Sequence, residues 1–149
     1  MNFTEATESF FRKYADFSSR SSRSEYWYAY LFIAMAGLGI GFLEGFMGLF
    51  PQSNQSILII PFQIGVLIPS FAILARRLHD INKSGWWIFF PATTVIFFIL
   101  GFLIALAINS LFIGIAILFV GFIPLIIFIY WTALKSGDLE SNRFGPPSN

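Results

Sequence analysis

The chain has 149 residues, of which 56% are hydrophobic and 11% are charged, and its formal net charge is +1. Soluble domains carry about 25% charged residues, and a water-soluble core of this size could not bury so much apolar surface. The composition therefore excludes an ordinary soluble protein, and the small net charge gives no sign of a nucleic-acid partner. The lack of cysteine excludes disulfides, thiolate nucleophiles and zinc–thiolate sites. We expect an all-α, polytopic membrane protein that forms one integral membrane domain over 1–149.

The first 17 residues have the pattern of a short amphipathic helix. Aromatic side chains recur at spacings of seven, four and three between Phe3 and Phe17, which is a helical stripe. Thr4 or Thr7 is expected to cap its start, because a hydroxyl there can accept a hydrogen bond from the first turn. The stripe is compatible with two arrangements: an interfacial helix on the inner membrane surface, or a helix packed on the cytoplasmic ends of the spanning helices.

Four apolar stretches follow, each long enough for a membrane-spanning helix, which needs about 20 residues. The predicted helices cover about 27–50, 57–75, 86–108 and 111–134. The last two share one uncharged run, and its polar dipeptide Asn109-Ser110 predicts the turn between them. Residues 135–149 then form a polar tail.

All nine lysines and arginines fall on one side of this four-helix arrangement. By the positive-inside rule that side is cytoplasmic, so we expect two in–out–in helix pairs with the N-terminus and the C-terminus in the cytoplasm. Trp27, Trp86 and Trp87 cluster near the same boundary, as interfacial aromatic residues do.

The first spanning helix carries small residues and an acid on nearly one stripe. Gly37, Gly41 and Gly45 are spaced by four, a pattern that allows helix backbones to approach closely. Glu44 lies beside them at a depth similar to that of Gln63 in the second helix. We predict a Glu44–Gln63 hydrogen bond as a structural polar clamp inside the membrane.

The same features support other functions. An acid within a spanning helix is a functional hypothesis by default, and prolines break the second and fourth helices at Pro69 and Pro124. A small oligomeric transporter or channel that uses Glu44 and these kinked helices is therefore an alternative. It requires self-association, because four helices enclose little space. A phage-type membrane-permeabilising protein is a second alternative.

The polar segment 73–87, "ILARRLHDINKSGWW", separates the second and third predicted helices. His79-Asp80 is compatible with a general base or a metal site, but metal sites usually need three or four ligands and the chain has one histidine. We therefore expect no metal, no cofactor and no enzymatic activity. The electrostatic interpretation is a loop whose Asp80, with Glu25 and Asp138, neutralises nearby arginines, followed by a tight turn at Asn82 or Gly85.

Three polar motifs resemble those of the small bacterial inner-membrane proteins grouped as domain-of-unknown-function family 805, the YhaH-like proteins. They are "FSSRSSRSEYW" (17–27), "RRLHDINKSGWW" (76–87) and "GDLESNRFGPP" (137–147). The resemblance spans about residues 17–147 and implies a single-domain protein of the bacterial inner (cytoplasmic) membrane. It implies no activity. Ser19 and Ser141 stand where the family pattern has glycine.

All three motifs fall on the predicted cytoplasmic face, so we expect them to meet in one polar cap on an apolar bundle. The polar cap is defined by ten residues: Arg20, Arg23, Glu25, Arg76, Arg77, His79, Asp80, Lys83, Asn142 and Arg143. The corresponding function is a membrane scaffold or interaction protein whose cap binds anionic lipid or a protein partner. The expected partners are membrane lipids, a protein or further copies of the chain, and not nucleic acid.

Overall fold

The computed structural model describes residues 1–48 and 57–148, and within these ranges every regular element is a helix or a helical turn. In chain order they are α1 (Phe3–Arg12), α2 (Arg23–Phe46), α3 (Ile59–Asp80), the 3-10 turn η1 (Gly85–Phe89), α4 (Ala92–Ala107), α5 (Leu111–Ile129) and the π-helical turn η2 (Tyr130–Leu134). Four segments of the described chain are long and apolar enough to cross a membrane. The prediction of an all-α protein with four such helices is confirmed.

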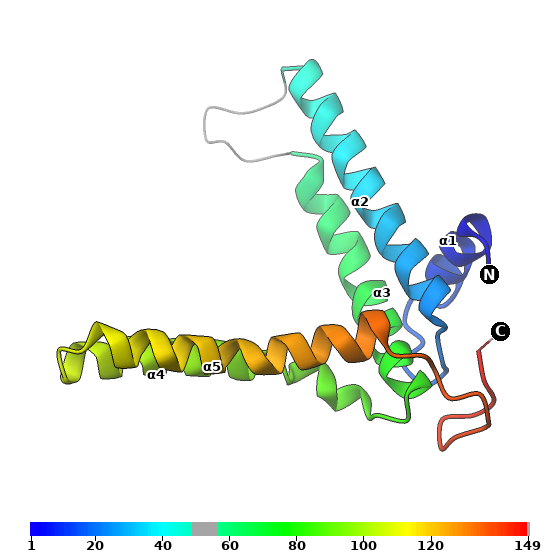
Figure 1. Ribbon diagram of the computed structural model, residues 1–149. Helices are drawn as coiled ribbons and strands as arrows, with labels where there is room; N and C mark the ends of the chain where they lie inside the picture. The colour runs from blue at the N-terminus through cyan, green and yellow to red at the C-terminus, as the bar shows by residue number, and fades with distance from the viewer. Residues whose placement is uncertain (49–56, 149) are drawn as a thin grey trace.

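The four long helices form two arms and not the expected bundle. Figure 1 shows α2 beside α3 in one arm and α4 beside α5 in the other, and the arms diverge from a junction that also holds α1 and both chain ends. The arms contact each other through η1 and η2 at that junction. Within each arm the two helices contact each other, but most of their large apolar side chains stay exposed, and the polar junction connects the two pairs.

The junction ends of α2 and α3 differ from the predicted boundaries. α2 begins at Arg23, four residues early, because Ser22 caps it: the Ser22 Oγ accepts a hydrogen bond from the Glu25 N–H at 3.3 Å. Its predicted end near residue 50 lies outside the described residues. α3 continues to Asp80 instead of ending at 75. The apolar run stops there but the helix does not, because its last turn is buried by other parts of the chain.

Two turns follow the predictions, and one helix is interrupted. Asn82 has a φ of 59° and takes the left-handed conformation after α3, and Asn109 has a φ of 48° between α4 and α5. The predicted helix over 86–108 divides into η1 and α4, because Pro91 lacks the N–H that would continue the first turn.

α1 packs on the junction. Asn2 caps it through a reciprocal pair of hydrogen bonds with Glu5, so the predicted Thr4 or Thr7 cap is wrong. Phe10 is fully buried, in a hydrophobic cluster with residues of α2 and α3. Of the two arrangements left open by the sequence, the structure has the packed one.

The close helix contacts lie in the second arm. A Cβ on Gly37 would meet Ile59 at an ordinary 3.8 Å, and a Cβ on Gly41 would meet nothing within 4 Å, so the predicted stripe does not bring α2 and α3 together. Gly45 lies in the last turn of α2. In the second arm, a Cβ on Gly114 would lie 2.5 Å from the Cβ of Ala105. This contact is not predictable from the sequence, because α4 and α5 share an apolar run in which glycines are not distinctive.

Candidate functional site

The polar cap is built around Asp80, at the last residue of α3. Its Oδ1 accepts from Arg20 Nε at 3.1 Å and Nη2 at 3.0 Å, and its Oδ2 accepts from Arg77 Nη1 at 2.6 Å. The side chains of all three residues are buried. Charge-assisted bonds of this length are strong, but one carboxylate faces two cations, so the remaining donors need other acceptors.

Backbone carbonyls at the end of the second arm supply those acceptors. The last carbonyls of a helix have no partner within the helix and carry its negative dipole end. Here the carbonyls of residues 132–135 receive, in order, Arg77 Nε at 2.9 Å, Trp27 Nε1 at 3.0 Å, Arg23 Nη1 at 3.1 Å and Arg77 Nη2. Donors from α2 and α3 therefore hold the end of the α5–η2 segment.

The tail folds back over the junction. Arg20 Nη1 donates to the carbonyls of Glu140 at 2.9 Å and Gly145 at 3.1 Å, and Asn142 Nδ2 donates to the His79 carbonyl at 3.0 Å. The Asp138 carboxylate accepts from Asn142 Nδ2 at 3.0 Å and forms no ion pair with an arginine among residues 1–48 and 57–148. Its predicted role in neutralising an arginine is therefore wrong, because its side-chain partner among the described residues is the Asn142 amide and not a guanidinium group.

Gly137 gives the tail its close approach to Asp80. A Cβ at this position would overlap the Asp80 carboxylate. The Asp138 N–H then donates to the Asp80 carbonyl at 2.8 Å. Glycine is needed here for lack of space and not for backbone conformation.

Arg76 connects the cap to the N-terminal segment. It is fully buried, and its Nη1 donates to the Lys13 carbonyl at 2.8 Å. Its Nη2 lies 3.9 Å from Glu25 Oε1, which accepts from Ser9 Oγ at 2.7 Å. α1, α2 and α3 therefore meet around a second buried ion pair.

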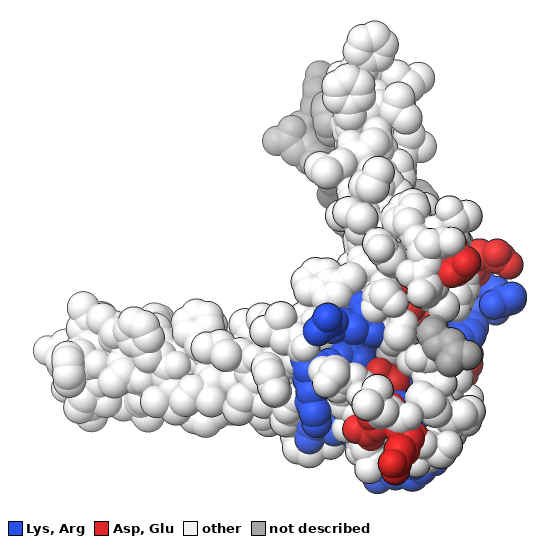
Figure 2. Space-filling model, turned by 45° about the vertical axis from the view of Figure 1, so that its right-hand side comes forward, with Lys and Arg blue, Asp and Glu red and all other residues white. Residues whose placement is uncertain are grey.

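The other cations of the cap lie on its rim. Lys83 Nζ lies 3.8 Å from the centroid of the Trp131 ring and 4.9 Å from that of Trp87, a cation–π arrangement. Arg143 is exposed and donates from Nη2 to the Asn82 carbonyl at 3.1 Å. Figure 2 shows the charged residues gathered at the junction, while the arms are uncharged on the face in view.

His79 has a structural role on one side of its ring. Its Nδ1 lies 3.2 Å from the Ser19 carbonyl oxygen, and its ring stacks on Phe144 at 3.8 Å between centroids. No group of three histidine, cysteine or acidic side chains that could hold a metal ion occurs in the part of the chain that the structure describes.

Asp16 organises the connector between α1 and α2. Its carboxylate accepts from the N–H and hydroxyl groups of Ser18 and Ser19 at 2.5 to 3.2 Å. Burial alone would raise the pKa of Asp16, but these hydrogen bonds from Ser19 and Ser18 outweigh it and hold the pKa well below its usual range. The ionised side chain therefore fixes the connector from which Ser19 reaches His79.

The intramembrane acid does not pair as predicted. Glu44 is fully buried, and its Oε1 accepts from the Leu58 N–H at 2.5 Å, next to the start of α3. Gln63 is exposed and forms no hydrogen bond with Glu44. The N–H groups at the start of a helix have no partner within the helix and favour an acid. The Leu58 N–H therefore binds Glu44 in place of the predicted Gln63 side-chain amide.

The structure places nine of the ten predicted cap residues in hydrogen bonds or ion pairs at the junction, with Arg143 and the cation–π residue Lys83 on its rim. Trp86 is 80% exposed, next to Trp87 in η1. Further cap residues were not predicted: Trp27 as a donor, Gly137 and Phe144, and the carbonyls of residues 132–135. The family resemblance marked the segments of Trp27, Gly137 and Phe144, but nothing in the side chains indicates the backbone acceptors.

The sequence profile of the family described as "Protein of unknown function (DUF805)" matches residues 14–146. The chain belongs to this family. The Escherichia coli K12 protein "Inner membrane protein YhaH" is 29% identical over 135 residues, which cover 91% of this chain and 88% of that protein. "Inner membrane protein YhaI" of the same organism is 35% identical over 77 residues, covering 51% and 61%. No solved structure matches the chain. These relatives and the four apolar helices support a multi-pass inner-membrane protein.

Proposed function

We propose that this member of the family is a membrane scaffold or interaction protein in which the polar cap joins two membrane-spanning helix pairs and binds anionic lipid or a protein partner. The observation that carries the proposal is the docking of the carbonyls of residues 132–135 on Arg77, Trp27 and Arg23. Through these contacts one arm is anchored to the other by Arg77, which is buried and ion-paired with Asp80, and by the more exposed Trp27 and Arg23, so the two arms keep a fixed relation.

The cations of the cap divide between two roles. Arg20, Arg76 and Arg77 are buried and bonded within the cap, so they stabilise the junction and are not available to a ligand. Arg143 on the rim of the cap and Arg12, which lies outside the cap at the end of α1, are exposed and are the cations we assign to anionic lipid. A basic residue near an anionic membrane surface contributes about 1 kcal/mol to binding.

We assign the junction to the cytoplasmic side, with both pairs following an in–out–in path. Two observations support this orientation. Both chain ends lie at the junction (Figure 1), and all nine lysines and arginines precede, separate or follow the two helix pairs and lie at that end. The opposite loop of the first pair, 51–56, lies outside the described residues.

The scaffold role is tested by the distance between the arms. The chain has no cysteine, so spin labels can be attached to cysteines introduced at Leu38 in α2 and Phe102 in α4, both strongly exposed. In lipid nanodiscs, pulsed electron paramagnetic resonance should give one narrow distance distribution, which Asp80→Asn broadens and Asp138→Asn leaves unchanged. A broad distribution in the otherwise wild-type chain contradicts a rigid scaffold.

Partner binding is tested on protein purified in mild detergent. Native mass spectrometry should show anionic lipid or a protein retained by the wild type and reduced in an Arg12→Gln, Arg143→Gln double variant of unchanged thermal stability. Equal retention by wild type and variant argues against binding at the rim.

The oligomeric transporter remains the alternative that Glu44 supports. Its Oε2 is buried and has no hydrogen-bond partner among the described residues, as expected of an acid that exchanges a proton or ion. A capping role requires only an acceptor for the Leu58 N–H, which Glu44→Gln keeps. Ion flux in proteoliposomes that disappears in Glu44→Gln, together with oligomers in native mass spectra, would favour the transporter over the scaffold.

A further inference from the structure

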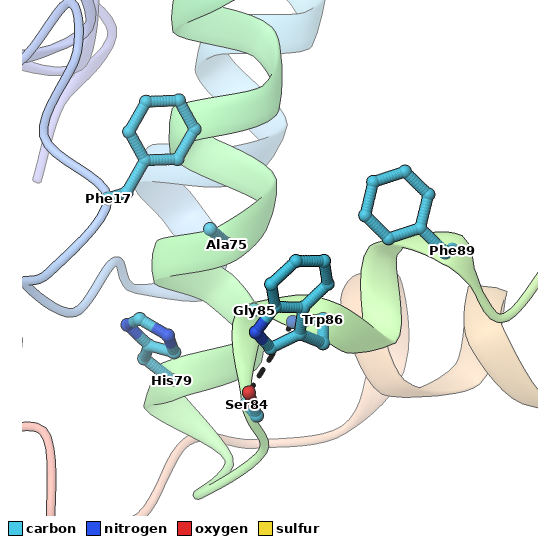
Figure 3. Close-up of a pocket in the computed structure, with 7 residues that line it drawn as sticks. All are labelled: Phe17, Ala75, His79, Ser84, Gly85, Trp86 and Phe89. Carbon is cyan, nitrogen blue, oxygen red and sulfur yellow. Dashed lines mark hydrogen bonds between the residues drawn. The ribbon is translucent and has the colours of Figure 1, made fainter.

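A groove of about 410 Å³ opens beside the cap, between the last turns of α3 and η1. Figure 3 shows the side chains that line it. They are Phe17, Ala75, His79, Ser84, Gly85, Trp86 and Phe89. The lining is mainly apolar, and none of these residues carries a carboxylate.

One polar atom in the groove has an unused lone pair. His79 is 94% buried (6% exposed). Its Nδ1 faces the Ser19 carbonyl, which can only accept, so Nδ1 carries the proton. No carboxylate of the described residues lies within ion-pair distance of the ring, so its surroundings favour the neutral form, in which Nε2 is an acceptor. Nε2 has no hydrogen bond to any described residue.

Nε2 is directed into the groove. A Cβ built on Gly85 would lie 3.5 Å from Nε2 and 3.5 Å from the Ala75 Cβ, so the glycine leaves the approach to this atom open. The occupant must therefore offer a hydrogen-bond donor to His79. A neutral donor fits better than an ammonium group, because no acid in the lining would compensate a buried positive charge.

The mouth of the groove is suited to a lipid. Trp86 is 80% exposed and Phe89 63% exposed. The same two residues, with Trp87 and Phe90, line an adjoining apolar depression of about 300 Å³. Tryptophans concentrate where the membrane meets water, and the continuous aromatic surface gives an acyl chain a path away from the polar atom.

We propose that this groove binds a phospholipid with a polyol headgroup, whose hydroxyl donates a hydrogen bond to His79 Nε2 while its acyl chains lie over Trp86 and Phe89. The site deepens the lipid part of the proposed function, and it uses neutral groups of the cap and not its exposed cations. Phosphatidylglycerol has the required headgroup. Phosphatidylethanolamine offers only an ammonium donor, and phosphatidylcholine has no donor in its headgroup.

Two variants remove the site in different ways. His79→Asn keeps a donor in the place of Nδ1 and removes Nε2. Gly85→Ala leaves His79 unchanged and places a methyl group in front of Nε2 at ordinary contact distance. The matched control is Gly37→Ala, the same change at an ordinary contact of 3.8 Å in the first arm.

The experiment titrates each lipid into the detergent-solubilised full chain and measures the bound fraction by native mass spectrometry. Wild type and Gly37→Ala should bind phosphatidylglycerol more tightly than the other two lipids. His79→Asn and Gly85→Ala should bind it about five-fold more weakly, as expected for one lost hydrogen bond. Equal binding of phosphatidylglycerol by all four proteins, or equal binding of the three lipids by wild type, overturns the proposal.

The melting temperature and the distance between the arms distinguish a failure of the lipid-site proposal from a failure of the scaffold proposal. If His79→Asn lowers the melting temperature, the decision rests on Gly85→Ala, whose backbone and contacts permit alanine. The spin-label distance between the arms reports the scaffold and should be unchanged in Gly85→Ala. A rigid junction without lipid selectivity would therefore refute the site alone, and a flexible junction with intact selectivity would refute the scaffold alone.

Discussion

Asp80 binds Arg77, one turn earlier on α3, and Arg20, which lies 60 residues earlier in the chain, through different carboxylate oxygens. The first contact is local to a helix, whereas the second requires the tertiary fold. Since Arg77 also donates to the end of the second arm and Arg20 to the tail, one carboxylate positions the cations that hold both of these segments to α3. This relationship makes Asp80 the most sensitive residue of the cap.

Asp80→Asn should destabilise the protein strongly. The substitution leaves two buried arginines without their shared counter-charge, and breaking a buried ion pair in this way costs about 3–5 kcal/mol. Thermal unfolding in detergent, followed by circular dichroism, measures the effect. Asp138→Asn is the matched control, because among residues 1–48 and 57–148 its carboxylate accepts only from the Asn142 amide. Similar melting temperatures for the two variants would contradict the central role of Asp80.

Gly137→Ala should have a similar effect without changing a charge. The new methyl group would occupy the space of the Asp80 carboxylate, so either Asp80 or the tail must move and the Arg20 contacts are lost. Gly41→Ala is the control, because its methyl group would meet nothing within 4 Å and alanine is favoured over glycine in a helix by about 1 kcal/mol. A Gly137→Ala protein as stable as Gly41→Ala would show that the tail does not press on Asp80.

The hydrogen bonds of the Asp16 carboxylate predict how its contribution to stability depends on pH. Its pKa in the folded protein is lowered, so its stabilising contribution is complete above the ordinary aspartate value of about 3.9. It is lost as the pH falls through the lower folded value. The difference in melting temperature between wild type and Asp16→Asn should therefore be constant from pH 7 to 5 and shrink below about pH 4. Glu8→Gln serves as the control, because Glu8 forms an exposed ion pair with Arg12 at 3.7 Å. A difference that does not change with pH would exclude this role of Asp16.

The in–out–in path predicts which positions an impermeant thiol reagent can reach. Cysteine at Ser110, between α4 and α5, should be labelled from outside spheroplasts, and cysteine at Ser141 in the tail only after the membrane is opened. The absence of native cysteine makes each signal specific. Labelling of Ser141→Cys in intact spheroplasts would reverse the orientation, and equal labelling of both positions would exclude the path.

The sequence by itself determined the membrane class, the number of spanning-length helices and the turn at Asn109, because apolar run length and turn chemistry are local properties. It also determined that Arg20, Arg76, Arg77 and Asp80 belong together, through the three polar motifs. Helix ends at the junction were less predictable, since α3 continues to Asp80 beyond the apolar run.

Only the tertiary structure decided how those residues pair and how the arms diverge. Most of the cap's acceptors are backbone carbonyls, as at residues 132–135, and a carbonyl is present at every residue, so no side-chain pattern indicates it. Glu44 likewise binds a backbone group, the Leu58 N–H at the start of α3, and not the side chain of Gln63. The α4–α5 contact rests on space left by Gly114, which becomes visible only when its neighbour Ala105 is known.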